Sequence, residues 1–192
     1  MDQSFKIETK RTLLRSYQSN DLNDHVTILN NWEVTKWLSN AIPFPYSRTD
    51  GELFINDEVA NFILGNRVTF SIIEKTTNCH MGGIRLFSLQ NEDCEIGYWL
   101  GPDYWNKGYA SEILDEIINW AFNHASINQL FALTTEKNIP SQNLLKKMGF
   151  FYRGAPPKQH TRCGQTEGCS AYFVLEKQSW LSSIQKLENV HG

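Results

Sequence analysis

The chain has 192 residues, of which 41% are hydrophobic and 12% aromatic, and it carries a formal net charge of −3. This length and apolar content suffice for one domain, residues 1–192, with a single core. Because 18 basic residues stand against 21 acidic ones, the sequence offers no broad positive surface for nucleic acid. Its first residues lack the apolar stretch of a signal peptide, and no apolar run approaches the roughly 20 residues that span a bilayer. We therefore expect a cytoplasmic protein without a nucleic-acid or membrane partner.

Cysteines and histidines show no pattern that is typical of a metal site. The four cysteines are scattered without a CxxC pair, so the sequence predicts neither a zinc site nor a disulfide framework. The five histidines belong to no motif, and each is interpreted as a surface or core imidazole. These residues are Cys79, Cys94, Cys163 and Cys169, and His25, His80, His124, His160 and His191. We expect no metal cofactor.

The first half of the chain predicts an edge strand, two helices and three antiparallel strands. Capping residues at 19–21 precede a polar helix, and the apolar face of Gly51–Leu64 is typical of a second helix. Alternation over 68–72, a turn at Asn78 and an apolar run predict a hairpin. The expected elements are a strand at 12–15, helices ending near residue 30 and covering 51–64, and strands at 68–72, 81–87 and 92–100. Between the helices, residues 32–47 are rich in aromatic residues and are either a loop that covers the core or a lip of a binding site.

The second half of the chain alternates helices and strands. Apolar residues recur at helical spacing from Ala110 to Phe122 and predict a helix packed on the sheet. Pro140 is expected to be the first residue of a further helix, which Gly149 ends. The remaining elements are strands at 130–135, 150–153 and 171–176 and a short helix or tail at 178–192. The predicted fold class is α/β (α+β), with a mixed, mostly antiparallel sheet of about seven strands flanked by helices.

The stretch YWLGPDYWNKGYASEIL, residues 98–114, is a candidate anion site because a strand ends there, passes Gly108 and becomes a helix. Such a junction brings free backbone N–H groups and the positive end of the helix dipole together, where a diphosphate binds well. Gly108 lets the backbone approach a phosphate, Ala110 keeps the first turn thin, and Lys107 adds charge. The spacing fits neither GxxxxGK[ST] nor GxGxxG. Taken alone, the junction is either a phosphate cradle or an ordinary tight turn.

Two motifs flank the helix that is predicted after Gly108. Residues 105–110, WNKGYA, fit the form Q/R-x-x-G-x-G/A except at Trp105, and residues 138–150, NIPSQNLLKKMGF, fit an N-x-x-S helix followed by K-x-G-F. Both resemble motifs of the GNAT acyltransferase superfamily, specifically of its branch of RimJ/RimL-type ribosomal-protein N-acetyltransferases. Further similarities extend the resemblance over nearly the whole chain, at residues 11–15, 81–86, 95–101 and 173–180.

The resemblance implies a sheet that is splayed between its fourth and fifth strands and that takes acetyl-CoA as cosubstrate. The pantetheine would pair with the backbone of the fourth strand, the diphosphate would lie on the amides of residues 106–111, and Asn138 would bond the pantetheine arm. Asn143 and Lys146 would neighbour the nucleotide, although Lys146 is equally interpreted as a solvated helix charge. The residues expected to bind acetyl-CoA are Tyr98, Trp99, Leu100, Trp105, Asn106, Lys107, Gly108, Tyr109, Ala110, Ser111, Asn138, Asn143 and Lys146.

Two residues are candidates for the chemistry, which needs a neutral amine, a polarised thioester carbonyl and a proton for the departing thiolate. Glu95 is the candidate base, directly or through water, because its strand borders the acceptor cleft; the alternative is a hydrogen-bonding edge residue. Ser141 matches the serine of the N-x-x-S motif and is a candidate hydrogen-bond donor to the CoA sulfur; the alternative is a helix cap. Many family members carry a tyrosine on this helix, but Leu145 stands at that position here.

The acceptor site is expected between the aromatic stretch and the loop at 153–168, because these regions flank the cleft in the family. Its candidate substrate-binding residues are Trp32, Trp37 and Tyr46, with Phe44 nearby. The expected function is transfer of the acetyl group to a primary amine, foremost a protein N-terminal α-amine, directly in a ternary complex. The alternatives are a polyamine or antibiotic acetyltransferase and a non-catalytic acyl-CoA-binding module. A homodimer is compatible with the sequence.

Overall fold

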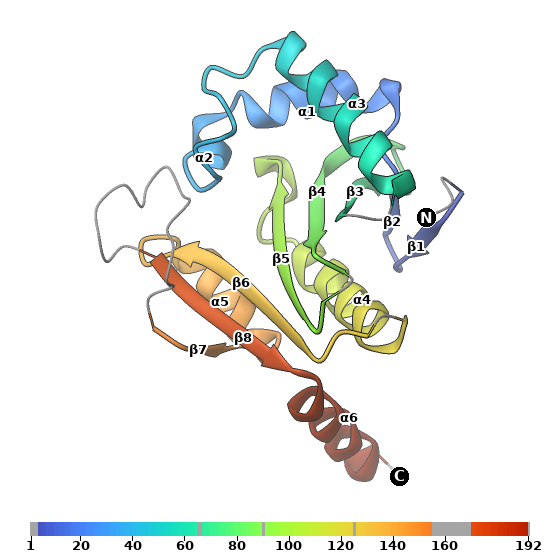
Figure 1. Ribbon diagram of the computed structural model, residues 1–192, viewed down its shortest axis with the longest axis vertical. Coiled ribbons are helices and arrows are strands. Elements are labelled where there is room, and N and C mark those ends of the chain that lie inside the picture. The colour runs from blue at the N-terminus through green and yellow to red at the C-terminus, as the bar shows by residue number, and fades with distance from the viewer. Residues whose placement is uncertain (1–3, 65–66, 90, 125, 155–169, 192) are drawn as a thin grey trace.

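In the computed structural model, which describes residues 4–64, 67–89, 91–124, 126–154 and 170–191, eight strands form one mixed sheet (Figure 1). Their spatial order is β1-β2-β3-β4-β5-β6-β8-β7, and every neighbouring pair is antiparallel except β5 and β6. The strands are β1 (Lys6–Glu8), β2 (Thr12–Arg15), β3 (Arg67–Glu74), β4 (His80–Phe87), β5 (Asp93–Leu100), β6 (Gln129–Thr135), β7 (Phe151–Tyr152) and β8 (Ser170–Glu176). The predicted fold class is confirmed. The strand that the sequence pattern missed is β1, in which only the middle residue is buried.

The helices lie on both faces and at both ends of this sheet. They are α1 (Leu22–Leu29), α2 (Trp32–Thr35), α3 (Arg48–Leu64), α4 (Tyr109–His124), α5 (Ile139–Lys147) and α6 (Lys177–His191), with short 3-10 turns at Ser19–Asp21 and Pro102–Tyr104. Figure 1 shows α1, α2 and α3 together at one end of the molecule and α6 at the other. Among the described residues, no helix has the length and apolar character needed to cross a membrane.

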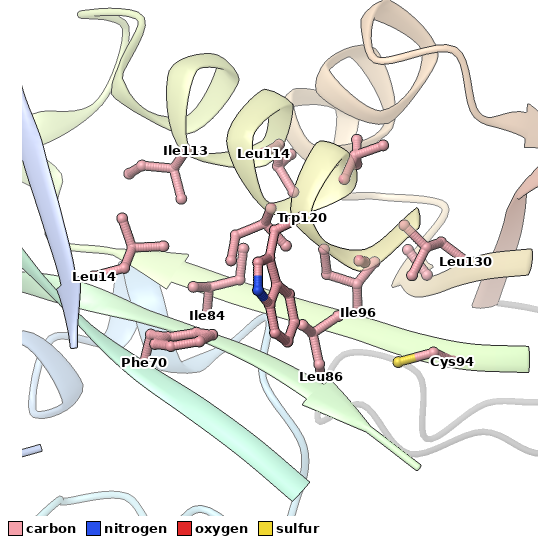
Figure 2. Packing of buried hydrophobic residues seen from close by; sticks show 14 of the residues in the cluster. Leu14, Phe70, Ile84, Leu86, Cys94, Ile96, Ile113, Leu114, Trp120 and Leu130 are labelled. Carbon is pink, nitrogen blue, oxygen red and sulfur yellow. The ribbon is translucent and has the colours of Figure 1, made fainter. Parts of the chain in front are cut away.

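The main core lies between α4 and the strands. The apolar stripe predicted for this helix is buried, and Ile113, Ile117 and Phe122 are each no more than 2% exposed. Figure 2 shows Ile113, Leu114 and Trp120 close to strand residues such as Leu14 and Ile84. Since burying one such aliphatic side chain stabilises a fold by about 1.5–3 kcal/mol, this stripe fixes α4, and with it the loop at the N-terminus of α4, on the sheet.

The sheet splays between β5 and β6, as the resemblance implies. These are the fourth and fifth of the strands expected from the sequence, because β1 was not among them. These parallel strands pair only from Asp93↔Gln129 to Glu95↔Phe131. Beyond Glu95, β5 stays paired with β4 as far as Leu100, whereas β6 stays paired with β8 as far as Thr135. The two halves of the sheet therefore separate into a V, which Figure 1 shows as the divergence of β5 from β6. The facing backbone edges of this V need hydrogen-bond partners from outside the sheet.

Several element boundaries differ from the sequence-based expectation because of side-chain caps. Helix α3 begins at Arg48, three residues before Gly51, and the backbone N–H of Asp50 donates to Ser47 Oγ at 3.2 Å. Residues 32–47, for which the sequence predicts a loop or a lip of a binding site, begin with the short helix α2, which Asn31 caps. In α5 the cap is Asn138, so that Pro140 is the second helical residue and not the first. The left-handed φ of +86° at Gly149 ends this helix as expected, and the terminal segment is helical.

Candidate active site

A cleft of about 630 Å³ occupies the V between β5 and β6. Its volume is within the range of small-molecule sites. One end is formed by the loop that precedes α4, the middle by β5, β6 and the start of α5, and the other end by α2, α3 and the face of β3 and β4. Residues from nearly every element at the centre of the fold therefore line this cleft.

The structure brings most of the sequence-predicted site residues to this cleft. Those that line it are Glu95, Tyr98, Trp99, Leu100, Trp105, Asn106, Gly108, Tyr109, Ala110, Ser111, Asn138, Ser141 and Trp37. Those that do not line it are Lys107, Asn143, Lys146, Trp32 and Tyr46. Residues 155–168, which make up most of the acceptor loop expected at 153–168, lie outside the described residues.

The loop before α4 presents its backbone to the cleft. Asn106 and Gly108 adopt left-handed φ values of +58° and +80°, a conformation that glycine reaches at no steric cost. A Cβ at Gly108 would approach no neighbour closer than 3.5 Å, so conformation, and not space, favours glycine there. The amides of the first turn of α4 have no acceptor within the helix. Together with the helix dipole, they suit an anion such as a diphosphate.

Arg11, in the turn between β1 and β2, holds this loop in place. Its Nη1 donates to the carbonyl oxygen of Lys107 at 2.9 Å, and its Nε donates to Glu112 at 2.7 Å. Its guanidinium carbon lies 4.1 Å from the centre of the Tyr109 ring. The sequence does not predict this role, because Arg11 and Lys107 are 96 positions apart and no local pattern connects them.

A lysine of α5 lies close to the N-terminus of α4. Lys147 Nζ donates to Ser111 Oγ at 3.1 Å. The lysine expected to neighbour the nucleotide was the adjacent Lys146. Consecutive helical residues point in directions about 100° apart, so a choice between two adjacent lysines depends on the rotation of the helix. The structure therefore brings Lys147, and not Lys146, to the first turn of α4, where the guanidinium of Arg11 also lies, although Lys147 does not itself line the cleft.

Trp105, where this chain departs from the Q/R-x-x-G-x-G/A pattern, closes the end of β5. Its indole Nε1 donates to the carbonyl oxygen of Leu100 at 2.8 Å, and 38% of the residue is exposed. The Leu100 carbonyl therefore already has a partner within the chain. The tryptophan side chain therefore has a structural role at the end of β5.

Ser141 and Tyr98 form a bridge between the two sides of the V. Their hydroxyl oxygens are 3.0 Å apart. Burial raises the pKa of Tyr98 to about 12, although the bond to Ser141 partly opposes this effect. Asn138 Oδ1 accepts from the backbone N–H of Ser141 at 3.3 Å and is the cap of α5. The alternative interpretation of Ser141 as the helix cap is therefore wrong, and its hydroxyl lies at the cleft.

Glu95 lies where the V begins. It is the last residue of β5 that pairs with β6, and it stands opposite Phe87 on β4. Its side chain is partly exposed and lines the cleft. Side chains alternate along a strand, so Glu95 and Trp99 lie on the same face of β5, which is the face toward α1 and α3.

Two of the three predicted acceptor-binding aromatic residues, Trp32 and Tyr46, do not line the cleft. Trp32 packs on Phe44 with 5.0 Å between ring centres. Tyr46 is 4% exposed, and its hydroxyl lies 3.3 Å from His25 Nε2 in a second buried cluster. Four charged residues at the α3 end of the cleft were not predicted from the sequence: Asp57, Glu58, Arg67 and Arg85. Among the described residues, no group of three or more acidic, histidine or cysteine side chains is arranged to hold a metal ion.

Comparisons with known proteins agree with this geometry. Residues 11–151 match the family model of the acetyltransferase (GNAT) domain. The uncharacterized N-acetyltransferase p20 of Bacillus licheniformis is 33% identical over 150 residues, which cover 76% of this chain and 82% of p20.

Two solved structures share the fold. An acetyltransferase (GNAT family) from Bacillus anthracis has a TM-score of 0.75 at 22% identity and covers 91% of this chain and 99% of its own. RimL, a ribosomal L7/L12 α-N-protein acetyltransferase solved in complex with coenzyme A, has a TM-score of 0.75 at 14% identity and covers 90% of this chain and 98% of its own. The family match extends over most of the chain, and the chain belongs to the GNAT acetyltransferase family.

Proposed function

We propose that this acetyltransferase moves the acetyl group of acetyl-CoA directly to a primary amine, foremost the α-amine of a protein N-terminus, while both substrates occupy the V. The observation that carries the proposal is the order of groups along one cleft. The amide-bearing loop at residues 105–111 forms one end, the Ser141–Tyr98 pair and Glu95 line the middle, and the acceptor end lies beneath α2 and α3.

At the end of the cleft assigned to acetyl-CoA, backbone amides and a lysine ammonium support the proposal. The diphosphate of acetyl-CoA would accept hydrogen bonds from the amides of residues 106–111, next to the ammonium of Lys147. The pantetheine would use the edge of β5 that loses its partner after Glu95. Asn138 remains a candidate for the pantetheine arm, although its Oδ1 is already engaged as the α5 cap.

The chemistry requires two proton transfers and no covalent enzyme intermediate. The acceptor attacks the thioester carbon as a neutral amine, after its ammonium form has lost one proton to solvent. Glu95, directly or through a water molecule, takes the second proton that the nitrogen loses as the new C–N bond forms. The C–S bond breaks, Ser141 donates its proton to the departing sulfur, and Tyr98 returns a proton to Ser141 through their hydrogen bond. Solvent then takes the proton from Glu95 and restores the one on Tyr98. The Ser141–Tyr98 pair supplies an acid at the place where Leu145 replaces the tyrosine of other family members.

Release of free thiol from acetyl-CoA, assayed with N-terminal peptides, polyamines and aminoglycosides, tests the proposal. We expect release with peptides that carry a free α-amine and none when the same peptides are blocked. Release with polyamines or aminoglycosides alone would favour the small-amine alternative. Tight CoA binding without turnover on any acceptor would favour a non-catalytic acyl-CoA-binding module.

A further inference from the structure

The acceptor end of the cleft contains a cluster of charged residues on one face of the sheet. Arg85 of β4 is opposite Thr69 of β3 and Gly97 of β5. Because side chains alternate along strands, Arg85 lies on the same face as Glu95, which is its diagonal neighbour across the strand pair. The helix α3 covers this face with Glu58, which also lines the cleft.

The guanidinium of Arg85 is held in one position. Its Nε donates to Thr69 Oγ1 at 2.8 Å, and its Nη2 donates to Glu58 Oε1. Its central carbon lies 5.5 Å and 5.2 Å from the ring centres of Phe54 and Phe87. Among the described residues Nη1 makes no hydrogen bond, so this group remains for a ligand. A planar, pre-positioned guanidinium is well suited to bind a carboxylate.

The ion pair that Arg85 makes with Glu58 is shared with a second arginine. One oxygen, Oε1 of Glu58, accepts from Arg85 and also from Arg67 Nη2 at 2.9 Å. The second carboxylate nearby, that of Asp57, is 60% exposed and pairs with Arg67. Burial lowers the pKa of Arg85 despite the opposing effect of Glu58, and the neighbouring Arg67 lowers it further. Asp57, Glu58, Arg67 and Arg85 thus form one cluster of two carboxylates and two guanidinium groups, in which the guanidinium of Arg85 keeps donor capacity for a further acceptor.

Space for that anion exists between Arg85 and β5. Gly97 has no side chain, and a Cβ added there would have only a Phe87 carbon, at 3.8 Å, within 4 Å. The cleft therefore extends past Gly97, from Glu95 toward Arg85. An acceptor whose amine lies at Glu95 would have the atoms next to that amine near the guanidinium of Arg85.

We propose that Arg85 selects the acceptor by binding a carboxylate that lies close to the reacting amine. The inference rests on the function proposed above. The carboxylate comes either from a free amino acid or from an aspartate or glutamate at the first positions of a peptide. A polyamine has no carboxylate to offer to Arg85 and would lack this interaction. Glu58 and Thr69 are positioning residues that hold Arg85.

Matched acceptors test this inference in the wild-type enzyme. Peptides beginning with aspartate or glutamate are compared with otherwise identical peptides beginning with asparagine or glutamine, and free amino acids with their amides. A hydrogen-bonded charged pair is worth roughly 1.5–3 kcal/mol, so we expect kcat/KM to be about 10-fold to 100-fold higher for each acid than for its amide. The pair that shows this preference identifies the source of the carboxylate. Equal kcat/KM values for acids and amides would overturn the inference.

Variants separate this inference from the proposed function. In Arg85→Gln the acid-to-amide preference is expected to fall to about one, and in Arg85→Lys to an intermediate value, because lysine keeps the charge but loses the planar fork. Arg48→Gln is the control, since Arg48 is exposed and pairs with Glu52 on α3. Calorimetric binding of CoA shows that each variant is folded. An unchanged preference in folded Arg85→Gln contradicts the inference. If Arg85→Gln does not fold, an unchanged acid-to-amide preference in folded Arg85→Lys contradicts the inference instead. Absence of thiol release from wild-type enzyme with every amine contradicts the proposed function instead.

Discussion

At the scale of single residues, the hydroxyl pair of Ser141 and Tyr98 is the part of the cleft suited to protonate a thiolate. With a pKa of about 12, the Tyr98 phenol keeps its proton at neutral pH and stands behind Ser141 as a second donor. Because general acids contribute about 10²-fold to 10⁴-fold in rate, Ser141→Ala is expected to lower kcat by about 10²-fold with little change in the Kd of CoA. Tyr98→Phe is expected to lower kcat less, since Ser141 keeps its own proton.

Steady-state kinetics at saturating acetyl-CoA, together with calorimetric titration of CoA, measure both effects. Ser182→Ala on α6 is the control, because the hydroxyl of Ser182 bonds its own helix backbone. Wild-type kcat in Ser141→Ala would show that the thiolate takes its proton from another group.

The second prediction at this scale concerns Glu95 as the base. Glutamine has nearly the same shape but cannot accept the proton of the amine, so Glu95→Gln is expected to lower kcat by about 10²-fold or more while CoA still binds. Glu92→Gln provides a matched control, because Glu92 is exposed in the turn before β5. If Glu92→Gln reduced kcat and Glu95→Gln did not, the base would lie at the turn and not at the start of the V.

At the scale of elements, the connection between the β1–β2 turn and the start of α4 determines how well the anion-binding loop is formed. Removing the side chain in Arg11→Ala breaks the bonds to Lys107 and Glu112, each bond to a charged group being worth about 1.5–3 kcal/mol. Part of this energy is expected to appear as an increase of about tenfold in the KM for acetyl-CoA, with kcat nearly unchanged. Lys10→Ala, at the exposed neighbouring position, is the control. A KM equal to that of the wild type would show that the loop holds its shape without Arg11.

The elements that the sequence predicted are those whose patterns are long and regular. The stripe of α4 and the hairpin of β3 and β4 follow from apolar spacing, and the motif around Gly108 indicated the loop. The short helix α2 and the strand β1 contain too few residues for a periodic signal. Arg11, Lys147 and Arg85 were missed for a different reason: each acts through a partner on another element, and only the folded topology brings the two together.

At the scale of the whole molecule, a buried pair of histidines links stability to pH. His25 and His80 lie 5.5 Å apart between ring centres, and burial lowers their pKa values to about 3 and about 4. Both are therefore neutral in the folded protein, whereas in the unfolded chain they bind protons near pH 6.5. The stability that they contribute is complete above pH 6.5 and is lost as pH falls toward their folded pKa values, by about 1.4 kcal/mol per pH unit for each histidine.

Urea unfolding between pH 7.5 and pH 5 checks this expectation. The slope of the unfolding free energy against pH is expected to be shallower in the double variant His25→Asn/His80→Asn, whatever its absolute stability. His124→Asn is the control, since His124 is exposed. An identical slope in the double variant and the wild type would assign the pH dependence to other groups.

The two halves of the sheet separate at the V between β5 and β6, and direct transfer requires that both substrates occupy this V together. Initial rates of thiol release, with acetyl-CoA and an N-terminal peptide varied against each other, test this requirement most directly. Direct transfer in a ternary complex predicts double-reciprocal lines that intersect. Parallel lines, which are the signature of a covalent acetyl-enzyme, or the absence of release with any primary amine, would contradict it.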